Sequence, residues 1–250
     1  MIDKRKIDGV RNSCKIAAEI MGRISSFISE GMTTKDLDIF AAKSMAEFKV
    51  RSAFLGHNGF PGSICVSVND EILHGIPSSC KVISRGDIVK VDMGVVLNGF
   101  YSDTAYTFLI EDSSQKSIEC RQLMDANLSA LMAGIDAARP DKTVGAVALA
   151  IQTSLKTRGY EPVDNMCGHG VGVRLHEPPS VPNRLEGWDC SAPLRPGMTI
   201  AIEPMVGIGT RTIMVKNDGW TLVTDNGKDS SHFEHTILIT ENEPEILTKI

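Results

Sequence analysis

Apolar residues recur at helical spacing along the first fifty positions of the chain. Steps of three and four residues place them on one stripe of an amphipathic helix. The stripe comprises Ile7, Val10, Cys14, Ala17, Met21, Ile24 and Ile28. A second helix is predicted to start at Thr33 and to run through Phe48, because Thr33 and Asp36 have the spacing of a capping box. Two helices therefore precede the first predicted strand.

The pattern then changes to short β-like runs. Residues 64–68 and 88–96 are rich in β-branched side chains, and residues 100–108 follow the dipeptide Asn98-Gly99, the strongest two-residue hairpin signal. With that turn, Leu97 faces Phe100 across the strands. The sequence therefore predicts a hairpin whose register is fixed.

The same order of elements recurs in the second half. Helices are predicted over 117–137 and from Thr143 to near Gly159, and strands over 199–206, 221–223 and 235–240. A change of composition at 111–114 separates the two series. We therefore expect one domain, 1–250, built as two pseudo-symmetric α/β halves of about 1–112 and 113–250. Because hairpins connect its strands, the sheet should be antiparallel and the fold class α+β.

Composition excludes several classes of function. The net charge is −5 with both signs interspersed, so no basic field argues for nucleic acid. No apolar run approaches the roughly 20 residues of a membrane helix. Six cysteines are scattered without CxxC pairs, which is typical of reduced thiols in a cytoplasmic protein. We expect a cytoplasmic protein that binds neither membrane nor nucleic acid directly.

The predicted hairpin carries two acidic residues on one face. Its register places Asp92 opposite Ala105 and Asp103 opposite Gly94, so the carboxylates are diagonal neighbours about 7–8 Å apart at the backbone. Like charges at that separation are costly to bury unless a cation lies between them or one carboxylate is protonated.

Three further stretches place ionisable groups where a strand or a glycine-rich turn should bury them. His169 lies between glycines in CGHGVGVRLHEPP, and His176 follows in the same segment. Glu203 interrupts the apolar run TIAIEPMV, and Glu234 precedes the apolar run of SHFEHTILIT. Each residue alone is compatible with a turn or a strand end. Together, four carboxylates and one imidazole supply a charge that two divalent cations cancel, and the ligand types suit Mn²⁺, Fe²⁺, Co²⁺ or Zn²⁺.

At these motifs the chain resembles the methionine aminopeptidases. Five stretches match in order and with similar spacing: Asp92, Asp103, His169 in GHGVG, Glu203 in IEPM and Glu234 in FEHT. The similarity covers nearly the whole chain, including LHGIP at 73–77 and GHNGFPGSICVSVND at 56–70. It implies the pita-bread fold, a curved antiparallel sheet with helices on its outer face, and the type I form of the enzyme.

The resemblance also implies the chemistry. Metal-dependent removal of the N-terminal methionine from polypeptides with a small second residue is expected. The ligands would be the five residues above, holding two divalent ions of Co, Mn, Fe, Zn or Ni, with Asp103 and Glu234 bridging. Glu203 would also shuttle a proton. His74 and His176 would contact the scissile amide and stabilise the oxyanion, because a neutral imidazole donates a hydrogen bond without adding charge.

The chain departs from the family pattern around the substrate's first side chain. Bacterial type I members usually place tyrosine at His57, often tyrosine at Phe60, and phenylalanine at Leu175. The remaining lining residues keep the pocket apolar, so methionine stays the expected guest. The implied substrate-binding residues are His57, Phe60, Cys65, His74, Leu175, His176 and Trp220. A threonine often found two residues after the first aspartate is replaced by Gly94, which removes a possible hydrogen bond near the metals.

Two alternatives remain open. An X-prolyl aminopeptidase or prolidase shares the metal set and the fold but normally carries an extra N-terminal domain. A metal-free binding protein on this fold would have lost its ligands, whereas all five are present here. The expected partners are polypeptide N-termini as substrate, with a ribosome contact left open, and the chain is expected to be a monomer.

Overall fold

Four helices form where the apolar stripes predicted them. The computed structural model describes residues 3–249, in which the helices are α1 (Lys4–Phe27), α2 (Thr34–Glu47), α3 (Gln115–Ala137) and α4 (Val144–Lys156), with a short 3₁₀ turn, η1 (His57–Gly59). The Thr33 side chain accepts the Asp36 N–H, and the Asp36 carboxylate accepts the Thr33 N–H, so the predicted capping box is present. Thr143 caps α4 by accepting the Gly145 N–H.

The strands are short and numerous. They are β1 (Arg51–Ser52), β2 (Cys65–Val68), β3 (Glu71–Leu73), β4 (Ile88–Met93), β5 (Val95–Leu97), β6 (Phe100–Tyr101), β7 (Thr104–Leu109), β8 (Cys167–Gly170), β9 (Glu177–Pro182), β10 (Thr199–Ile202), β11 (Met205–Gly207), β12 (Ile213–Val215), β13 (Leu222–Thr224), β14 (Ser230–His232), β15 (Glu234–Leu238) and β16 (Glu245–Ile246). The predicted run 199–206 is divided in two, because Pro204 has no N–H to donate to a ladder. The glycine-rich segment at His169 forms β8 instead of a turn.

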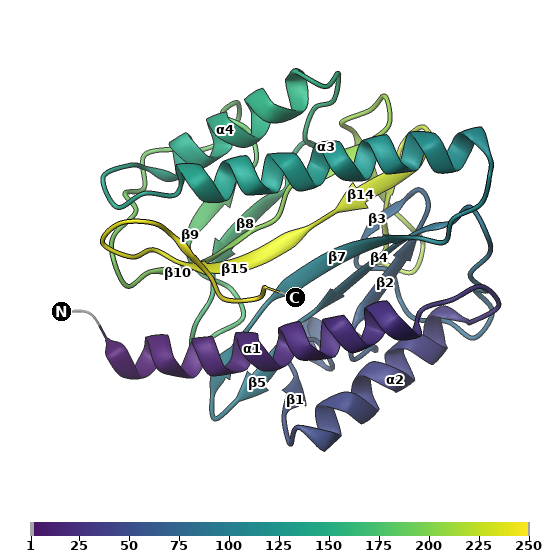
Figure 1. Cartoon of the computed structure of the whole chain (residues 1–250), viewed down its shortest axis with the longest axis horizontal. Helices are drawn as coiled ribbons and strands as arrows, with labels where there is room; N and C mark the ends of the chain where they lie inside the picture. Colours follow the sequence, from purple (N-terminus) through teal and green to yellow (C-terminus); the bar gives the residue numbers. More distant parts are fainter. Residues whose placement is uncertain (1–2, 250) are drawn as a thin grey trace.

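One eight-stranded sheet organises the molecule. Its order is β2-β4-β7-β15-β10-β8-β9 with β16 beside β15, and every pair is antiparallel as predicted. Figure 1 shows all four helices on one face of this sheet. Strands from residues before 112 occupy one side of the sheet and later strands the other, meeting where β7 pairs with β15. The prediction of an α+β fold with a curved sheet and outer helices is confirmed. The assignment of one domain with half boundaries near 112 stays a prediction.

The predicted hairpin register is confirmed. Asp92 pairs with Ala105 in β4–β7, and Leu97 pairs with Phe100 in β5–β6. Between these two ladders the chain approaches itself closely at Gly94. A Cβ there would lie 2.4 Å from the Ser102 carbonyl oxygen and 3.0 Å from the Ala53 Cβ. A threonine at position 94 would therefore require the Ser102 strand to shift, and the loss of a hydrogen bond near the metals stays a prediction.

Two apolar cores bind the helices to the sheet. One core joins α1 and α2 to β2 and β4, and the other joins α3 and α4 to β10 and β15. In β4, Val89 and Val91 belong to the first core, so the alternation of side chains along a strand turns Lys90 and Asp92 to the opposite face. Burial of the helical stripes thus fixes which sheet face receives the acidic residues.

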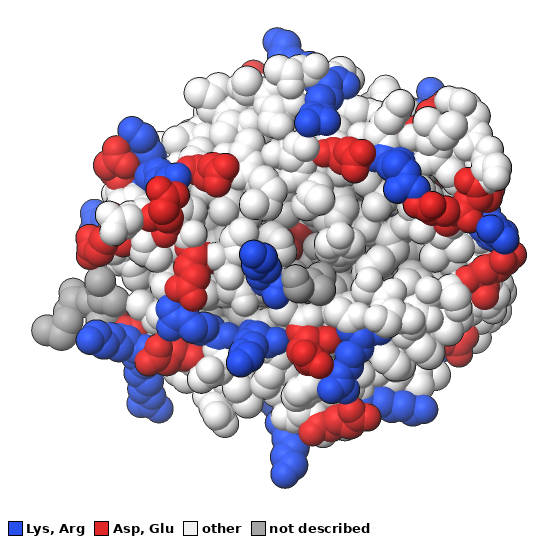
Figure 2. Space-filling view, viewed as in Figure 1, with Lys and Arg blue, Asp and Glu red and all other residues white. Residues whose placement is uncertain are grey.

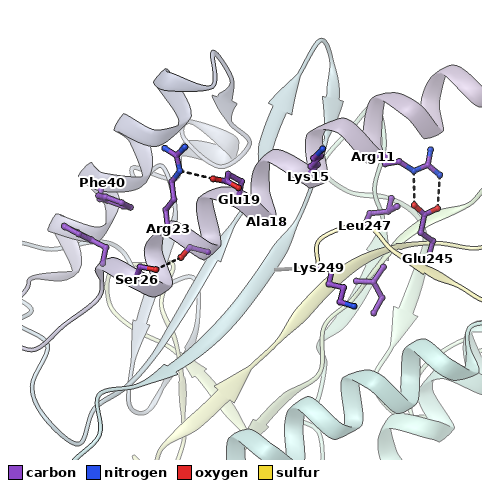
Figure 3. A pocket seen from close by; sticks show the side chains of 13 residues that line it. Arg11, Lys15, Ala18, Glu19, Arg23, Ser26, Phe40, Glu245, Leu247 and Lys249 are labelled. Atoms are coloured by element: carbon purple, nitrogen blue, oxygen red, sulfur yellow. Dashed lines mark hydrogen bonds and ion pairs between the residues drawn. The ribbon is translucent and has the colours of Figure 1, made fainter.

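The surface carries mixed charge. Figure 2 shows lysines and arginines interspersed with acidic residues over the helical face, in agreement with the dispersed charge of the sequence. A groove of about 840 Å³ lies between α1 and residues 245–249, where Arg11 forms a two-pronged ion pair with Glu245 (Figure 3). Within residues 3–249, no helix combines the length and the apolar character needed to cross a membrane.

Candidate metal centre and substrate pocket

The five predicted ligand residues come from five separate segments of the chain. Asp92 lies near the end of β4, Asp103 between β6 and β7, His169 in β8, Glu203 directly after β10, and Glu234 at the start of β15. The sheet brings them together because Ala105 pairs with Asp92 on one side and with Glu234 on the other. A small alanine between two acidic neighbours leaves space above the sheet for their carboxylates.

Their ligand atoms form two overlapping groups. One carboxylate oxygen each from Asp92, Asp103 and Glu234 lie within 4.8 Å of one another, and so do atoms of His169, Glu203 and Glu234. Glu234 belongs to both groups. The four acidic residues are between 2 % and 8 % exposed. Such a set of hard oxygen donors with one imidazole is suited to divalent cations.

His169 is oriented as a metal ligand requires. Its Nδ1 lies 2.9 Å from the Gly170 carbonyl oxygen, so this nitrogen carries the proton. The other nitrogen, Nε2, then has a free lone pair and lies 3.4 Å from Glu203 Oε1 and 3.6 Å from Asp103 Oδ2. Burial lowers the pKa of His169 to about 4, so the ring is neutral at physiological pH.

Burial and mutual repulsion disfavour the ionised form of the four carboxylates. Burial raises the pKa of Asp92 to about 7. Burial, together with repulsion from neighbouring carboxylates, raises the pKa of Asp103, Glu203 and Glu234 well above their usual range. These directions describe a site where negative charge has collected without compensation.

Orphaned oxygen atoms provide a direct test of fit to a cation. Asp92 Oδ1, Asp103 Oδ1 and Glu234 Oε1 are buried and have no hydrogen-bond partner among the described residues. Buried polar atoms without partners are uncommon in folded proteins and are satisfied at metal sites by the ion. The residues present therefore fit a divalent metal.

A narrow pocket opens beside this cluster. Its cavity measures about 80 Å³ and includes the five predicted ligand residues in its wall. The remaining lining residues are Phe54, His57, Phe60, Cys65, Leu73, His74, Leu175, His176 and Trp220. The Trp220 ring meets the Phe60 ring edge to face at 5.2 Å between centroids, and Cys65 and Leu175 belong to the same apolar cluster. All seven predicted substrate-binding residues therefore line one cavity.

The two other predicted active-site histidines, His74 and His176, line the same pocket. The His176 ring lies 4.3 Å from the His169 ring between centroids, and a His176 nitrogen lies within 4.8 Å of ligand atoms of Asp103 and His169. His74 follows β3 in a left-handed conformation with φ of +56°, which a non-glycine residue adopts at some energetic cost. The next residue secures this turn, because the Gly75 N–H donates to Ser67 Oγ. Burial lowers the pKa of both histidines, that of His74 to about 4.

Three nearby residues were missed by the sequence analysis. Phe54 and Leu73 line the pocket. Leu73 directly precedes the predicted His74 in the sequence, and Phe54 lies three positions before the predicted His57. His232 is 1 % exposed, its ring nitrogens have no hydrogen-bond partner among the described residues, and its Nε2 lies 3.8 Å from Glu203 Oε2. The motif SHFEHT offered its signal, a histidine two positions before a predicted ligand.

Known proteins are similar to this chain over nearly its whole length. The model of metallopeptidase family M24 matches residues 8–241. The methionine aminopeptidase 1 of Bacillus subtilis is 39% identical over 247 residues, which cover 98% of this chain and 97% of the relative. The crystal structure of methionine aminopeptidase from Thermotoga maritima superposes with a TM-score of 0.93 at 38% identity and full coverage of both chains.

A solved structure with lower sequence identity is a prolidase, which is the alternative enzyme class. Prolidase from Pyrococcus furiosus matches with a TM-score of 0.80 at 25% identity, covering 100% of this chain and 65% of that one. The two enzyme classes thus share the fold, while the sequence identity separates them. On this evidence the chain belongs to metallopeptidase family M24, among the methionine aminopeptidases.

Proposed function

We propose that this protein is a metal-dependent methionyl aminopeptidase that removes the first methionine of polypeptides whose second residue is small. The observation that carries the proposal is the buried cluster of four carboxylates and His169 in the wall of a narrow apolar pocket. Full-length similarity to methionine aminopeptidases supports the same activity. The pocket accounts for selection of an apolar first residue and the cluster for hydrolysis of the bond next to it.

We assign two divalent cations to the cluster. Four carboxylates carry a charge that two such ions neutralise, and Co, Mn, Fe, Zn and Ni are all compatible with the donor set. Asp92, Asp103, His169, Glu203 and Glu234 would hold these ions, with Asp103 and Glu234 as the ligands shared between them. When bound, the ions lower the pKa of water and polarise the scissile carbonyl.

The chain's own side chains supply the remaining functions. Glu203 is proposed to hold and return the proton of the attacking water, because its carboxylate adjoins both the cluster and the pocket. His74 and His176 are proposed to donate hydrogen bonds to the carbonyl oxygen as it becomes an oxyanion. Both are neutral at physiological pH because burial lowers the pKa of each, so they can donate without adding a cation beside the metals.

The first side chain of the substrate is proposed to lie among Phe60, Cys65, Leu175 and Trp220, with His57 at the same pocket. A flexible thioether fills an irregular apolar cavity well. The cavity is small, about 80 Å³. Polypeptide N-termini are the proposed partners, while a ribosome contact, a monomeric state and a cytoplasmic location stay predictions.

A peptide assay tests the proposal. The purified chain is treated with a chelator, single metals are restored, and cleavage of Met-Ala-Ser and Met-Lys-Ser is followed. We expect Met-Ala-Ser to be cleaved only after metal is restored and Met-Lys-Ser to resist. Cleavage of an Ala-Pro peptide with Met-Ala-Ser left intact would favour the prolidase alternative. Failure to retain any metal would favour the binding-protein alternative.

A further inference from the structure

The loop of residues 171–176 carries two groups of the proposed active site. It connects β8 to β9, and it holds Leu175 in the apolar pocket and His176 against His169. Leu175 is 4 % exposed, whereas Val173 at the tip is 54 % exposed. Neither pocket residue belongs to a strand, so their positions depend on what fixes the loop.

Glu177, the first residue after the loop, accepts hydrogen bonds from the loop backbone. Its Oε1 accepts the N–H of Val173 at 2.7 Å and the N–H of Arg174 at 3.0 Å. The loop turns tightly over this carboxylate, since a Cβ on Gly172 would lie 2.9 Å from Glu177 Oε2. One carboxylate oxygen thus sets the backbone path immediately before Leu175 and His176.

The other oxygen of Glu177 is held by the N-terminal helix. Lys6 Nζ, on α1, donates to Glu177 Oε2 at 2.8 Å, and the two side chains are 27% and 12% exposed. The Lys6 stem also packs against the turn, because a Cβ on Gly172 would meet Lys6 Cε at 2.2 Å. This ion pair is more shielded than a surface pair, so its contribution is screened less by solvent.

We propose that Lys6 and Glu177 act together as positioning residues, which hold the 171–176 loop so that Leu175 and His176 meet the substrate. The inference rests on the proposed function for its catalytic consequence but not for its structural one. A misplacement of about 1 Å in a catalytic group can cost as much as a hundredfold in rate. The first turn of α1 is thereby part of the active-site architecture although it contributes no residue to the pocket wall.

The variants Lys6→Met, Glu177→Gln and their combination test this inference. Methionine keeps the apolar stem of Lys6 without its charge. Glutamine retains an oxygen that can accept the Val173 and Arg174 amides but has no charge to attract Lys6. Lys15→Met is the matched control, because Lys15 lies on the same helix, lines the groove of Figure 3 and makes no ion pair with the described residues.

Two readouts are measured on each variant. Hydrogen exchange of the Val173 and Arg174 amides, recorded without substrate, is expected to accelerate about tenfold in both single variants and to stay at the wild-type rate in Lys15→Met. The kcat/KM for Met-Ala-Ser is expected to fall about tenfold, with most of the loss in kcat because His176 acts in the transition state. Metal affinity, measured by calorimetric titration, should be unchanged.

The double variant and the conservative substitution Lys6→Arg test whether Lys6 and Glu177 act as a pair. The double variant should lose no more than either single variant, because both remove the same pair, and Lys6→Arg should restore exchange and turnover. Additive losses, wild-type exchange rates in both single variants, or a uniform fall in thermal stability without a change in kcat would overturn the inference. A wild-type chain that fails to cleave Met-Ala-Ser would refute the proposed function alone, since the exchange measurement needs no substrate.

Discussion

Replacement of Asp103 by asparagine is expected to shift the stability of the metal-free and metal-loaded protein in opposite directions. Asparagine has nearly the same shape as aspartate. The backbone at this position is held independently of the side chain, because its N–H donates to Thr236 Oγ1 and its carbonyl accepts from the same hydroxyl. The substitution Asp103→Asn therefore removes one negative charge and one ligand oxygen and changes little else.

The distances in the cluster give the magnitude. Ligand oxygens of Asp92, Asp103 and Glu234 lie within 4.8 Å of one another. Two like charges at this separation repel by about 3 kcal/mol at an effective dielectric constant near 20. Protonation relieves part of this repulsion, so we expect Asp103→Asn to stabilise the metal-free protein by about 2 kcal/mol at pH 8, or roughly 4–8 °C in Tm.

The sign of the pH dependence follows from the pKa of Asp103. Burial raises this pKa well above the usual range, so above about pH 4 the folded protein binds a proton that the unfolded chain has released. Stability contributed by this group is therefore present at low pH and is lost as the pH rises. The advantage of the variant over the wild type in the absence of metal should accordingly grow from acidic to alkaline pH.

Calorimetry with and without metal tests the expectation. In the presence of Mn²⁺ the order should reverse, because the variant loses a proposed bridging ligand and with it the stabilisation that metal binding would give to the folded state. Asp125→Asn, on the exposed surface of α3, is the control for loss of an acidic residue. A variant that melts below the wild type in chelator at pH 8 would refute the electrostatic argument. Two metals per chain with more than a tenth of the activity would refute the bridging role.

Three further predictions concern the pocket and the sheet. His176→Ala should lower kcat by about 10²–10³ and leave metal content, measured by elemental analysis, unchanged; a collapse of metal binding would show that the wrong histidine has been assigned. In a panel of peptides with alanine as the second residue, norleucine at the first position should be tolerated, because one methylene is worth only about 1–3 kcal/mol of binding free energy. A peptide with formylated methionine should not be cleaved, because an acylated amine has no free lone pair for a metal. Faster cleavage after a residue unlike methionine would contradict the pocket assignment. Gly94→Thr should lower stability by about 1–3 kcal/mol in denaturant titration, because a Cβ would lie 2.4 Å from the Ser102 carbonyl; an unchanged midpoint would show that the strands can separate there.

Local patterns were sufficient for the parts of the fold that local interactions determine. The capping box at Thr33 and the Asn98-Gly99 turn each act within a few residues, and both appear as predicted. The turn also fixes the pairing of Asp92 with Ala105, because a hairpin register propagates from its loop. The grouping of the five proposed ligand residues could be predicted for another reason, since each lies in a distinctive short motif.

Features set by distant contacts could not be predicted in this way. Strands β8 and β9 pair through residues rich in glycine and proline, with a register shift at His169. Neither sequence alternates apolar and polar residues as a typical strand does. Phe54 lies in the pocket only because the chain folds back there from β1. The crowding at Gly94 depends on the Ser102 carbonyl across the hairpin, so the steric limit at this position could not be predicted from the sequence.

The junction of β7 with β15 has a consequence for the order of events in refolding. Asp92 and Asp103 precede β7 in the chain, His169 and Glu203 lie between β7 and β15, and Glu234 belongs to β15, whose ladder with β7 has two residue pairs. Contacts between segments so distant in sequence form late, after the local helices and hairpins. Addition of metal should therefore leave the refolding rate nearly unchanged and slow unfolding. Interactions that form only after the folding transition state stabilise the native state without stabilising the transition state, so they affect the unfolding rate alone.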